Sequence, residues 1–395
     1  MYGAFGTWQN VEVDYTPEAG SLPNTVENFL EVSSRDAQNS DTQVDGVEYG
    51  LHSSYNADEG IEEYFPYWLE WGEDTEEYHA LSGVGGGTPN TRLHSYMVLS
   101  NGNGEWDLLY DFNTVGTTRL QEGAQLTQIY ATTAVVYPNT FTLLQPFENR
   151  VQVLDGNDQW RKPYLGETSR SEPKTCGALP HMNDPLWEEL NLPPWCVTTS
   201  QGTVQVPNFP TQVDYFRVDK RNTTTARAAG PAGTPRTVDP AARVANDVDQ
   251  AALQACLDKD PYGCLTTVPG LRACVAKRLA CNAGTVPDAV GGRTKRISAQ
   301  QALSMAGQRT KARLGDRSAS LLTDAKVRTV STDGLPQPLT RHLGPAAGRT
   351  VHLVTGEGTV PGLRNTGSRQ YTGYTFVYDA GTGALIYSCL GRNCP

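Results

Sequence analysis

The chain has 395 residues, a net charge of −11, 39 glycines and 25 prolines. This length exceeds one ordinary core, and the many turn formers favour short strands. The sequence has no apolar run of about 18 residues, so it predicts no membrane-spanning helix. Residues 1–150 carry 23 acidic and 4 basic side chains, a balance that excludes nucleic acid as their partner.

The charge is divided unevenly along the chain. Because residues 1–150 sum to −19 and the whole chain to −11, residues 151–395 sum to +8. Two readings stay open at this point. The acidic and basic parts are either independently solvated surfaces or are held together by ionic contacts within the chain.

Apolar and polar residues alternate with period two through the first part of the chain, and turn signals such as Asn-Gly and Asp-Gly separate the segments. This pattern predicts an all-β antiparallel sandwich of the jelly-roll type over residues 1–165. The expected strands are 7–15, 26–32, 44–51, 63–71, 92–99, 106–112, 125–137 and 147–154.

The middle of the chain changes character twice. Residues 166–222 predict a connector with a short helix near 184–190 and strands near 203–206 and 213–219. Residues 223–245 are rich in Ala, Pro, Gly and Thr and predict a linker. Residues 246–290 then become helical and predict a disulfide-linked α-hairpin with its turn at 268–270.

Eight cysteines occur in close groups and predict disulfides. A zinc site is the alternative, but no CxxC pair is present, so disulfides are favoured. In the helical segment a hairpin predicts nested pairing, Cys264 with Cys274 and Cys256 with Cys281, while sequential pairing stays open. Disulfides predict a secreted, extracellular protein. Met1 precedes strand-like sequence directly, so we expect any signal peptide to have been removed already.

The last region, residues 291–395, predicts an α+β domain in which one helix packs on an antiparallel sheet. Ser298 and Gln301 have the spacing of a capping box at the start of that helix. Strands are expected at 351–354, 371–378 and 384–389, with a hairpin turn at 379–383. The stretch YTFVYDAGTGALIY resembles the ending of PepSY-type, cystatin-like modules, which implies extracytoplasmic inhibition or binding.

Residues 44–80 are the best candidates for chemistry. Alternate residues of a strand share a face, so Trp68 lies beside Glu70, and a carboxylate beside an indole suits acid–base work. Glu48 has a similar setting beside an aromatic residue. We predict Glu48 and Glu70 as a catalytic pair, although a solvated strand glutamate is the competing reading. The predicted substrate-binding aromatic residues are Trp68, Tyr49, Tyr67 and Trp106.

Several stretches of residues 2–160 carry a family resemblance. They read YGA near the start, then VENFL, VEYG, FPYW and GEWD, and together they resemble the neprosin family of glutamic peptidases and, more distantly, the eqolisins. The resemblance implies a concanavalin-A-like sandwich with Glu48 as the first catalytic glutamate. The family's second glutamate belongs to a late strand, which here reads TQIYATTAVV and holds no carboxylate. Glu70 is then the candidate for the second, with Glu122 as an alternative under a shifted alignment.

Three functions remain in competition. One is a secreted, acid-acting glutamic endopeptidase whose partner is a protein or peptide substrate. Another is a non-catalytic sandwich that binds a peptide or a cell-surface glycan through its aromatic residues. The last is a peptidase precursor whose basic C-terminal region acts as inhibitor. His52, His79 and His94 lie in the same acidic region, and a metal site of histidine and carboxylate ligands is conceivable there. Histidines without a motif spacing are more often surface residues, so the sequence predicts neither metal nor cofactor.

Overall fold

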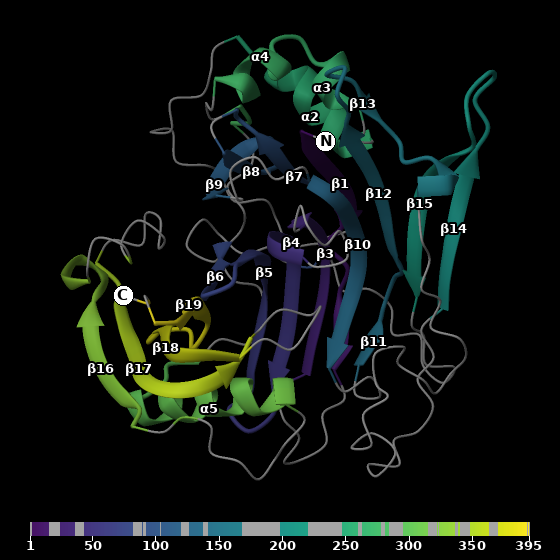
Figure 1. The fold of residues 1–395 in the computed structure, drawn as a ribbon. Coiled ribbons are helices and arrows are strands. Elements are labelled where there is room, and N and C mark those ends of the chain that lie inside the picture. The colour runs from purple at the N-terminus through teal and green to yellow at the C-terminus, as the bar shows by residue number, and fades with distance from the viewer. Residues whose placement is uncertain are drawn as a thin grey trace. The chain divides into compact units, whose positions relative to one another are not determined.

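A computed structural model describes residues 2–15, 24–35, 43–81, 89, 92–102, 104–119, 126–136, 141–167, 198–219, 247–259, 263–277, 281–283, 295–314, 322, 324–335, 339, 348–362, 370–392 and 394. The chain divides into two compact units that interleave along the sequence (Figure 1). The first unit comprises residues 1–15, 89–133 and 138–286, and the second comprises residues 16–88, 134–137 and 287–395.

The first unit is built on an antiparallel sheet with strand order β14-β15-β12-β1-β7-β8-β9. Strands β1, β7 and β8 are buried over nearly their whole length, whereas β12 alternates buried and half-buried residues. A short strand, β13, adds to β12, and β2 pairs with β11 apart from this sheet. The strands are β1 (Gly3–Gln9), β2 (Val13–Tyr15), β7 (Leu93–Ser100), β8 (Glu105–Tyr110), β9 (Asn113–Arg119), β11 (Phe141–Leu143), β12 (Phe147–Leu154), β13 (Trp160–Arg161), β14 (Thr198–Val204) and β15 (Gln212–Asp219).

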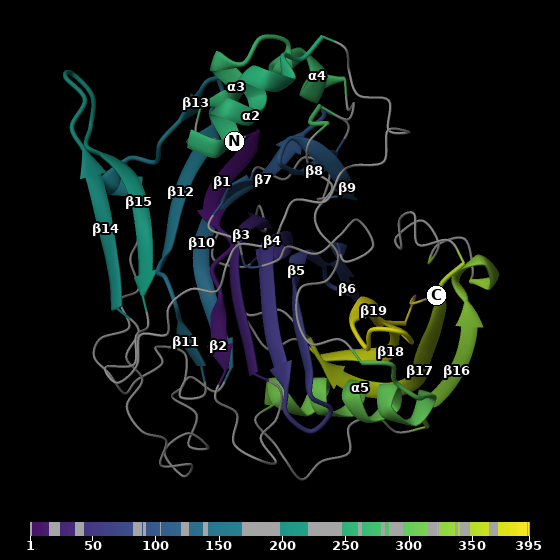
Figure 2. The same ribbon diagram turned by 180° about the vertical axis from the view of Figure 1, so that it is seen from behind.

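Three short helices of the first unit lie together beside β7 (Figure 2), namely α2 (Gln250–Lys259), α3 (Cys264–Thr267) and α4 (Leu271–Ala276). Their apolar side chains share a core with Phe5, Met97 and Leu109 of the sheet. The disulfides are Cys256–Cys264 and Cys274–Cys281, so the nested pairing expected for a hairpin is wrong and the sequential alternative is observed. The reason is local: each bridge closes a short turn at a helix end instead of linking two long helices.

The sheet of the second unit joins strands from both ends of the chain, in the order β3-β4-β5-β6-β19-β18-β17-β16. The junction is the antiparallel pair β6–β19, where Tyr387 lies opposite His79. The strands are β3 (Asn24–Arg35), β4 (Gln43–Asn56), β5 (Ile61–Trp71), β6 (Thr75–Ala80), β16 (Lys326–Ser331), β17 (Thr350–Pro361), β18 (Gln370–Asp379) and β19 (Leu385–Gly391). Strand β10 (Leu126–Val136) passes from one unit into the other.

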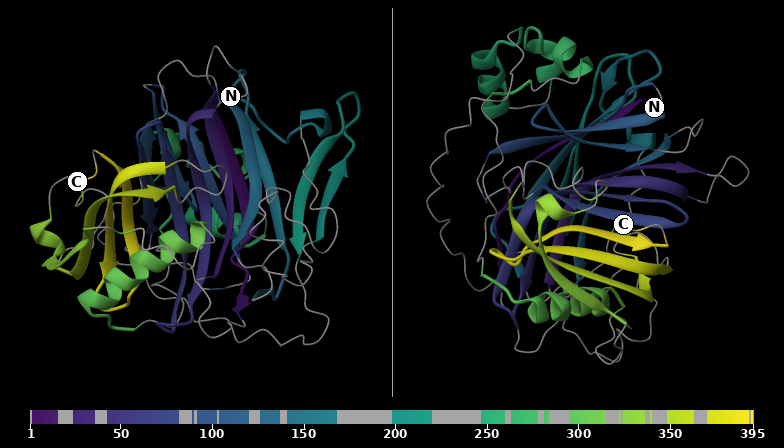
Figure 3. Two further views of the ribbon diagram at one scale, coloured as in Figure 1. Left: turned by 60° about the horizontal axis from the view of Figure 1, so that its bottom comes forward. Right: turned by 90° about the vertical axis from the view of Figure 1, so that its left-hand side faces the viewer.

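Helix α5 (Ala299–Leu314) packs on the curved C-terminal strands of this sheet (Figures 1 and 3). The predicted capping box is confirmed: the Ser298 amide donates to Gln301 Oε1 at 2.9 Å, and the Gln301 amide donates to Ser298 Oγ at 3.2 Å. The predicted hairpin turn is confirmed as well, because Asp379 Oδ1 accepts from the amides of Gly381 and Thr382. The short loop beyond β19 is closed by the disulfide Cys389–Cys394.

The prediction of a mostly antiparallel β protein with disulfides is confirmed, while the jelly-roll topology stays a prediction. Strands β6, β9 and β16 were not predicted, because their sequences lack a clear alternation of apolar and polar residues. The expected helix at 184–190 and the linker at 223–245 lie outside the described residues, as do Cys176 and Cys196, two of the eight cysteines. No helix among the described segments has the length and apolar character needed to cross a membrane.

Candidate functional site

The predicted catalytic residues Glu48 and Glu70 point to opposite faces of the second unit's sheet. Glu48 on β4 pairs with Leu69 on β5, whereas Glu70 pairs with Val47. Directly paired residues share a face and consecutive residues alternate. The structure therefore does not form the carboxylate pair that the sequence analysis expected. The side on which Glu63 meets helix α5 is called the helix face below, and the other side the reverse face.

Glu48 has a carboxylate neighbour of its own on the helix face. Glu31 of β3 lies directly opposite Glu48 in the ladder, which places their Cβ atoms about 4.5–5.5 Å apart. Both residues are 0% exposed. Sequence reasoning missed Glu31, although a signal was present. Glu27, Phe29 and Glu31 alternate with period two, so β3 carries two glutamates on the same face.

Two glycines of β4 allow neighbouring residues to pack closely on either side of Glu48. A Cβ atom on Gly46 would lie 2.5 Å from Trp71 Cζ2, and one on Gly50 would lie 2.5 Å from the Cα of Phe29. Only glycine permits such close packing on this face. Water is excluded as a result, and any charge that develops on Glu48 is strongly felt by its neighbours.

A second polar cluster lies on the same face, towards the β4–β5 turn. His52 Nδ1 is 2.7 Å from Glu27 Oε1, and His52 Nε2 is 3.5 Å from Glu63 Oε2. Glu63 also accepts hydrogen bonds from Ser54 Oγ and from the Leu385 amide, each at 2.8 Å. The cluster therefore links strands β3, β4, β5 and β19 through one buried glutamate.

Arg309 of α5 completes this cluster. Its Nη2 lies 2.5 Å from Glu63 Oε2, with 17% of the arginine side chain and 4% of the glutamate side chain exposed. Burial on its own would raise the pKa of Glu63, but the Arg309 guanidinium and the His52 hydrogen bond outweigh it and hold that pKa well below its usual range. Burial likewise opposes the charge on Arg309, yet Glu63 raises the pKa of the guanidinium further. The pair is an ionised, buried contact.

Further contacts hold α5 over the end of the β4–β5 hairpin. Gln308 Oε1 accepts from Asn56 Nδ2 at 2.8 Å, and Gln301 Nε2 donates to Glu59 Oε2 at 2.7 Å. Lys295 Nζ, just before the helix, is 3.9 Å from the same Glu59 oxygen. A small pocket remains beside Arg309, lined by Ser54, Asn56, Ile61, Glu63, Met305, Arg309 and Tyr378. It is far too small for a polypeptide, so this end of the helix face is filled by the chain itself.

The four aromatic residues predicted to bind substrate do not form one groove. Tyr67 belongs to the helix face, Tyr49 and Trp68 belong to the reverse face, and Trp106 belongs to the first unit. All four are buried. Their role in substrate binding stays a prediction, and it requires the protein to open.

Glu70 instead lies on the reverse face beside Glu77 and His79 of β6. The alternative second glutamate, Glu122, lies outside the described residues.

Comparisons of the chain with protein-family models, with curated proteins and with solved structures returned no match. The resemblances to glutamic peptidases and to PepSY-type modules therefore stay predictions.

Proposed function

We propose that this protein is a secreted glutamic endopeptidase in a closed form, with Glu48 and Glu31 as its catalytic carboxylates. The observation that carries the proposal is their direct cross-strand pairing on one face, with both side chains fully buried. Two carboxylates forced together are costly for stability alone, because like charges placed opposite each other repel. Such pairs recur where one group must act as base and the other as acid.

The chemistry requires only water and these two groups. One carboxylate removes a proton from water as the water oxygen bonds to the scissile carbonyl carbon. The other, protonated, gives its proton to the amide nitrogen as the C–N bond breaks. After product release the two groups again hold one proton between them. The packing of Trp71 over Gly46 and of Phe29 over Gly50 excludes bulk water from this site and strengthens each electrostatic contact.

The C-terminal region, residues 291–395, acts in this proposal as an inhibitor within the chain. Two features support this role. Strand β19 adds to the edge of β6, which is how peptide segments commonly dock on sheets. Helix α5 covers the end of the helix face and sets Arg309 on Glu63. The buried state of Glu31 and Glu48 is then the closed state of a precursor.

Export is proposed on the disulfides, because such bonds persist in oxidising compartments. The described residues contain three, in the helical segment and at the C-terminal loop. A peptidase released outside the cell also needs control before release, which is consistent with an inhibitory region carried on the same chain.

The direct test is hydrolysis of casein across the acid-to-neutral pH range, before and after limited proteolysis that releases the C-terminal region. We expect cleavage by the wild type and its loss in Glu48→Gln and in Glu31→Gln. The matched control is Glu62→Gln, since Glu62 is a half-buried glutamate of β5 on the reverse face. Cleavage that survives in Glu31→Gln contradicts the pair. A folded wild type that cleaves nothing in either form contradicts the peptidase and leaves the binding protein as the better hypothesis.

The inhibitory role has its own test. Arg309→Met removes the ion pair with Glu63 while keeping most of the side-chain volume, so we expect it to raise casein cleavage by the uncut chain. Arg328→Met is the control, because Arg328 is an exposed arginine of the same region, on β16. Equal activity in both variants, with the wild type active only after proteolysis, means that the contact of α5 with Glu63 is not what closes the enzyme.

A further inference from the structure

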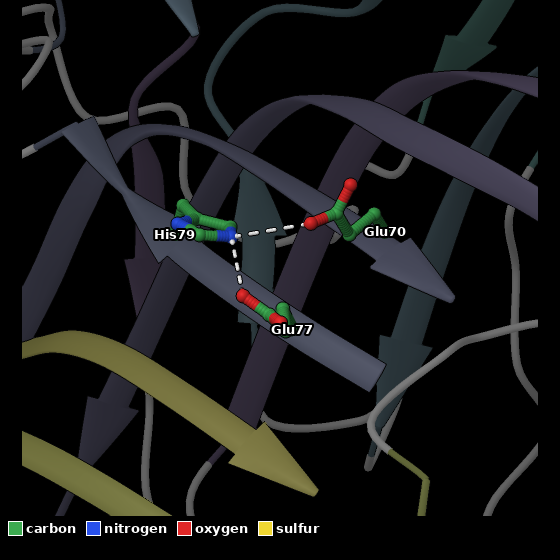
Figure 4. A group of neighbouring side chains, drawn as sticks. All are labelled: Glu70, Glu77 and His79. Carbon is green, nitrogen blue, oxygen red and sulfur yellow. Dashed lines mark ion pairs between the residues drawn. The ribbon is translucent and has the colours of Figure 1, made fainter. Parts of the chain in front are cut away.

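Three metal-binding side chains converge on the reverse face, outside the proposed catalytic pair (Figure 4). Glu70 of β5 and Glu77 of β6 are direct cross-strand partners, and His79 follows two residues after Glu77 on the same face. His79 Nε2 lies 4.0 Å from Glu70 Oε1 and 3.6 Å from Glu77 Oε2. One ligand atom of each residue lies within 4.8 Å of the others.

These spacings fit a small divalent cation. Zinc binds His nitrogen and carboxylate oxygen at about 2.0–2.2 Å, so two ligands of a tetrahedral ion lie about 3.3–3.6 Å apart. The pair of His79 and Glu77 already has that separation, and Glu70 reaches it by a small side-chain rotation. Two carboxylates and one imidazole leave a fourth position for water, the pattern of an open site.

The surroundings hold the ligands in place. The His79 ring is 2% exposed and stacks on Trp68 with ring centroids 3.5 Å apart. Tyr387 of β19 donates a hydrogen bond from its hydroxyl to Glu77 Oε2 at 3.1 Å. Such outer contacts orient the ligands of known metal sites.

The two carboxylates remain reachable, with 26% of the Glu70 side chain and 25% of the Glu77 side chain exposed. An ion can therefore enter from solvent without unfolding the sheet. A cation there also relieves the repulsion between the two directly paired glutamates, which is otherwise unfavourable in a ladder.

We propose that Glu70, Glu77 and His79 bind one divalent transition-metal ion of the zinc class. The ion joins β5 to β6 and, through Tyr387, strengthens the junction of β6 with β19. Its role is to hold the N-terminal and C-terminal strands of the second unit together. The proposal is independent of the peptidase hypothesis, because the site lies on the opposite face from Glu31 and Glu48.

The test is a titration of the full-length, tag-free, chelator-treated protein with Zn²⁺ by calorimetry and with Co²⁺ by visible absorption. We expect one ion per chain, the intense visible bands of four- or five-coordinate Co²⁺, and a rise in the unfolding temperature with added Zn²⁺. Loss of an outer contact typically costs about 10–100-fold in metal affinity. Tyr387→Phe should lower the affinity for Zn²⁺ by an amount in that range. Glu70→Gln or Glu77→Gln should lower it by at least about 100-fold.

The control variant is again Glu62→Gln, which should bind Zn²⁺ as the wild type does. His79→Gln removes a buried ring and can fail to fold, so the half-exposed glutamates decide the outcome. A folded wild type that binds no Zn²⁺ up to millimolar concentration overturns the proposal. So does unchanged affinity in both Glu70→Gln and Glu77→Gln.

Discussion

Two of the buried glutamates on the helix face of the second unit, Glu63 and Glu48, differ in what surrounds them. Glu63 is met by a guanidinium, a hydroxyl, a backbone amide and an imidazole. Glu48 has another carboxylate, Glu31, as its direct neighbour across the ladder. The first arrangement stabilises an ionised side chain. The second places two carboxyl groups side by side, an arrangement that general acid–base catalysis uses.

This contrast separates a structural glutamate from a candidate catalytic one on the same strands. Gly50, with Phe29 packed over it, lies between them on β4. The two clusters are therefore distinct sites, and a change in one should leave the other largely intact.

The largest effect is expected at the carboxylate pair. Glu48→Gln or Glu31→Gln should lower casein cleavage by about 10²–10⁴-fold, the usual contribution of general acid–base catalysis. The free energy of unfolding should change little, because the substitution keeps the shape of the side chain. Activity and denaturant unfolding measured on the same samples check both parts. A large loss of stability would mean that the pair is structural.

The next effect is expected at the ion pair. Arg309→Met leaves Glu63 buried without its counter-charge, which typically costs about 3–5 kcal/mol of unfolding free energy. Adding Glu63→Gln to Arg309→Met should restore much of that loss, since the uncompensated charge is then gone. Denaturant unfolding of the wild type, the two single variants and the double variant gives a double-mutant cycle for the ion pair. Equal stability of Arg309→Met and the wild type would contradict the buried pair.

The separation between the clusters depends on Gly50. An added Cβ meets the Asn28 carbonyl oxygen and the Phe29 backbone, neither of which can move freely. Gly50→Ala should therefore cost about 1–3 kcal/mol, the usual range for overpacking. Gly156→Ala is the control, because a Cβ at Gly156 has nothing within 4 Å. Thermal unfolding of both variants measures the difference.

The smallest effect concerns pH. The folded-state pKa of Glu63 is lowered, so the stability contributed by its ionised form is complete above its ordinary pKa of 4.5 and declines as the pH falls below it. The stability difference between wild type and Glu63→Gln should be constant from neutral pH down to about 4.5 and then shrink. Acid unfolding at a series of pH values measures it. A difference that already shrinks near neutral pH would contradict the lowered pKa.

The pH behaviour also bears on activation. Because the contact of Glu63 with Arg309 persists at mildly acid pH, acidification to that range does not break it. We expect release of the inhibitory region to require cleavage of the chain rather than acid alone. Casein cleavage measured at mildly acid pH with and without prior proteolysis distinguishes the two routes.

Local features of the fold were predictable from neighbouring residues. Period-two alternation located most strands, the Ser298–Gln301 spacing located the start of α5, and the turn after Asp379 was recognised from its glycines. Each of these features depends on interactions between residues a few positions apart, so the local sequence is enough to predict it. The placement of Glu48 on a strand with small and aromatic neighbours belongs to the same class.

What joins distant strands was decided only by tertiary structure. Alternation shows that Glu48 and Glu70 each lie on a face, but the register between β4 and β5 sets which face, and a shift of one residue inverts it. The partner of Glu48, the placement of Arg309 on Glu63 and the joining of β6 to β19 all depend on long-range pairing. Disulfide connectivity differs in scale: the sequence determined that these cysteines lie near one another, and the short helices α2, α3 and α4 decided that each bridge closes a local turn.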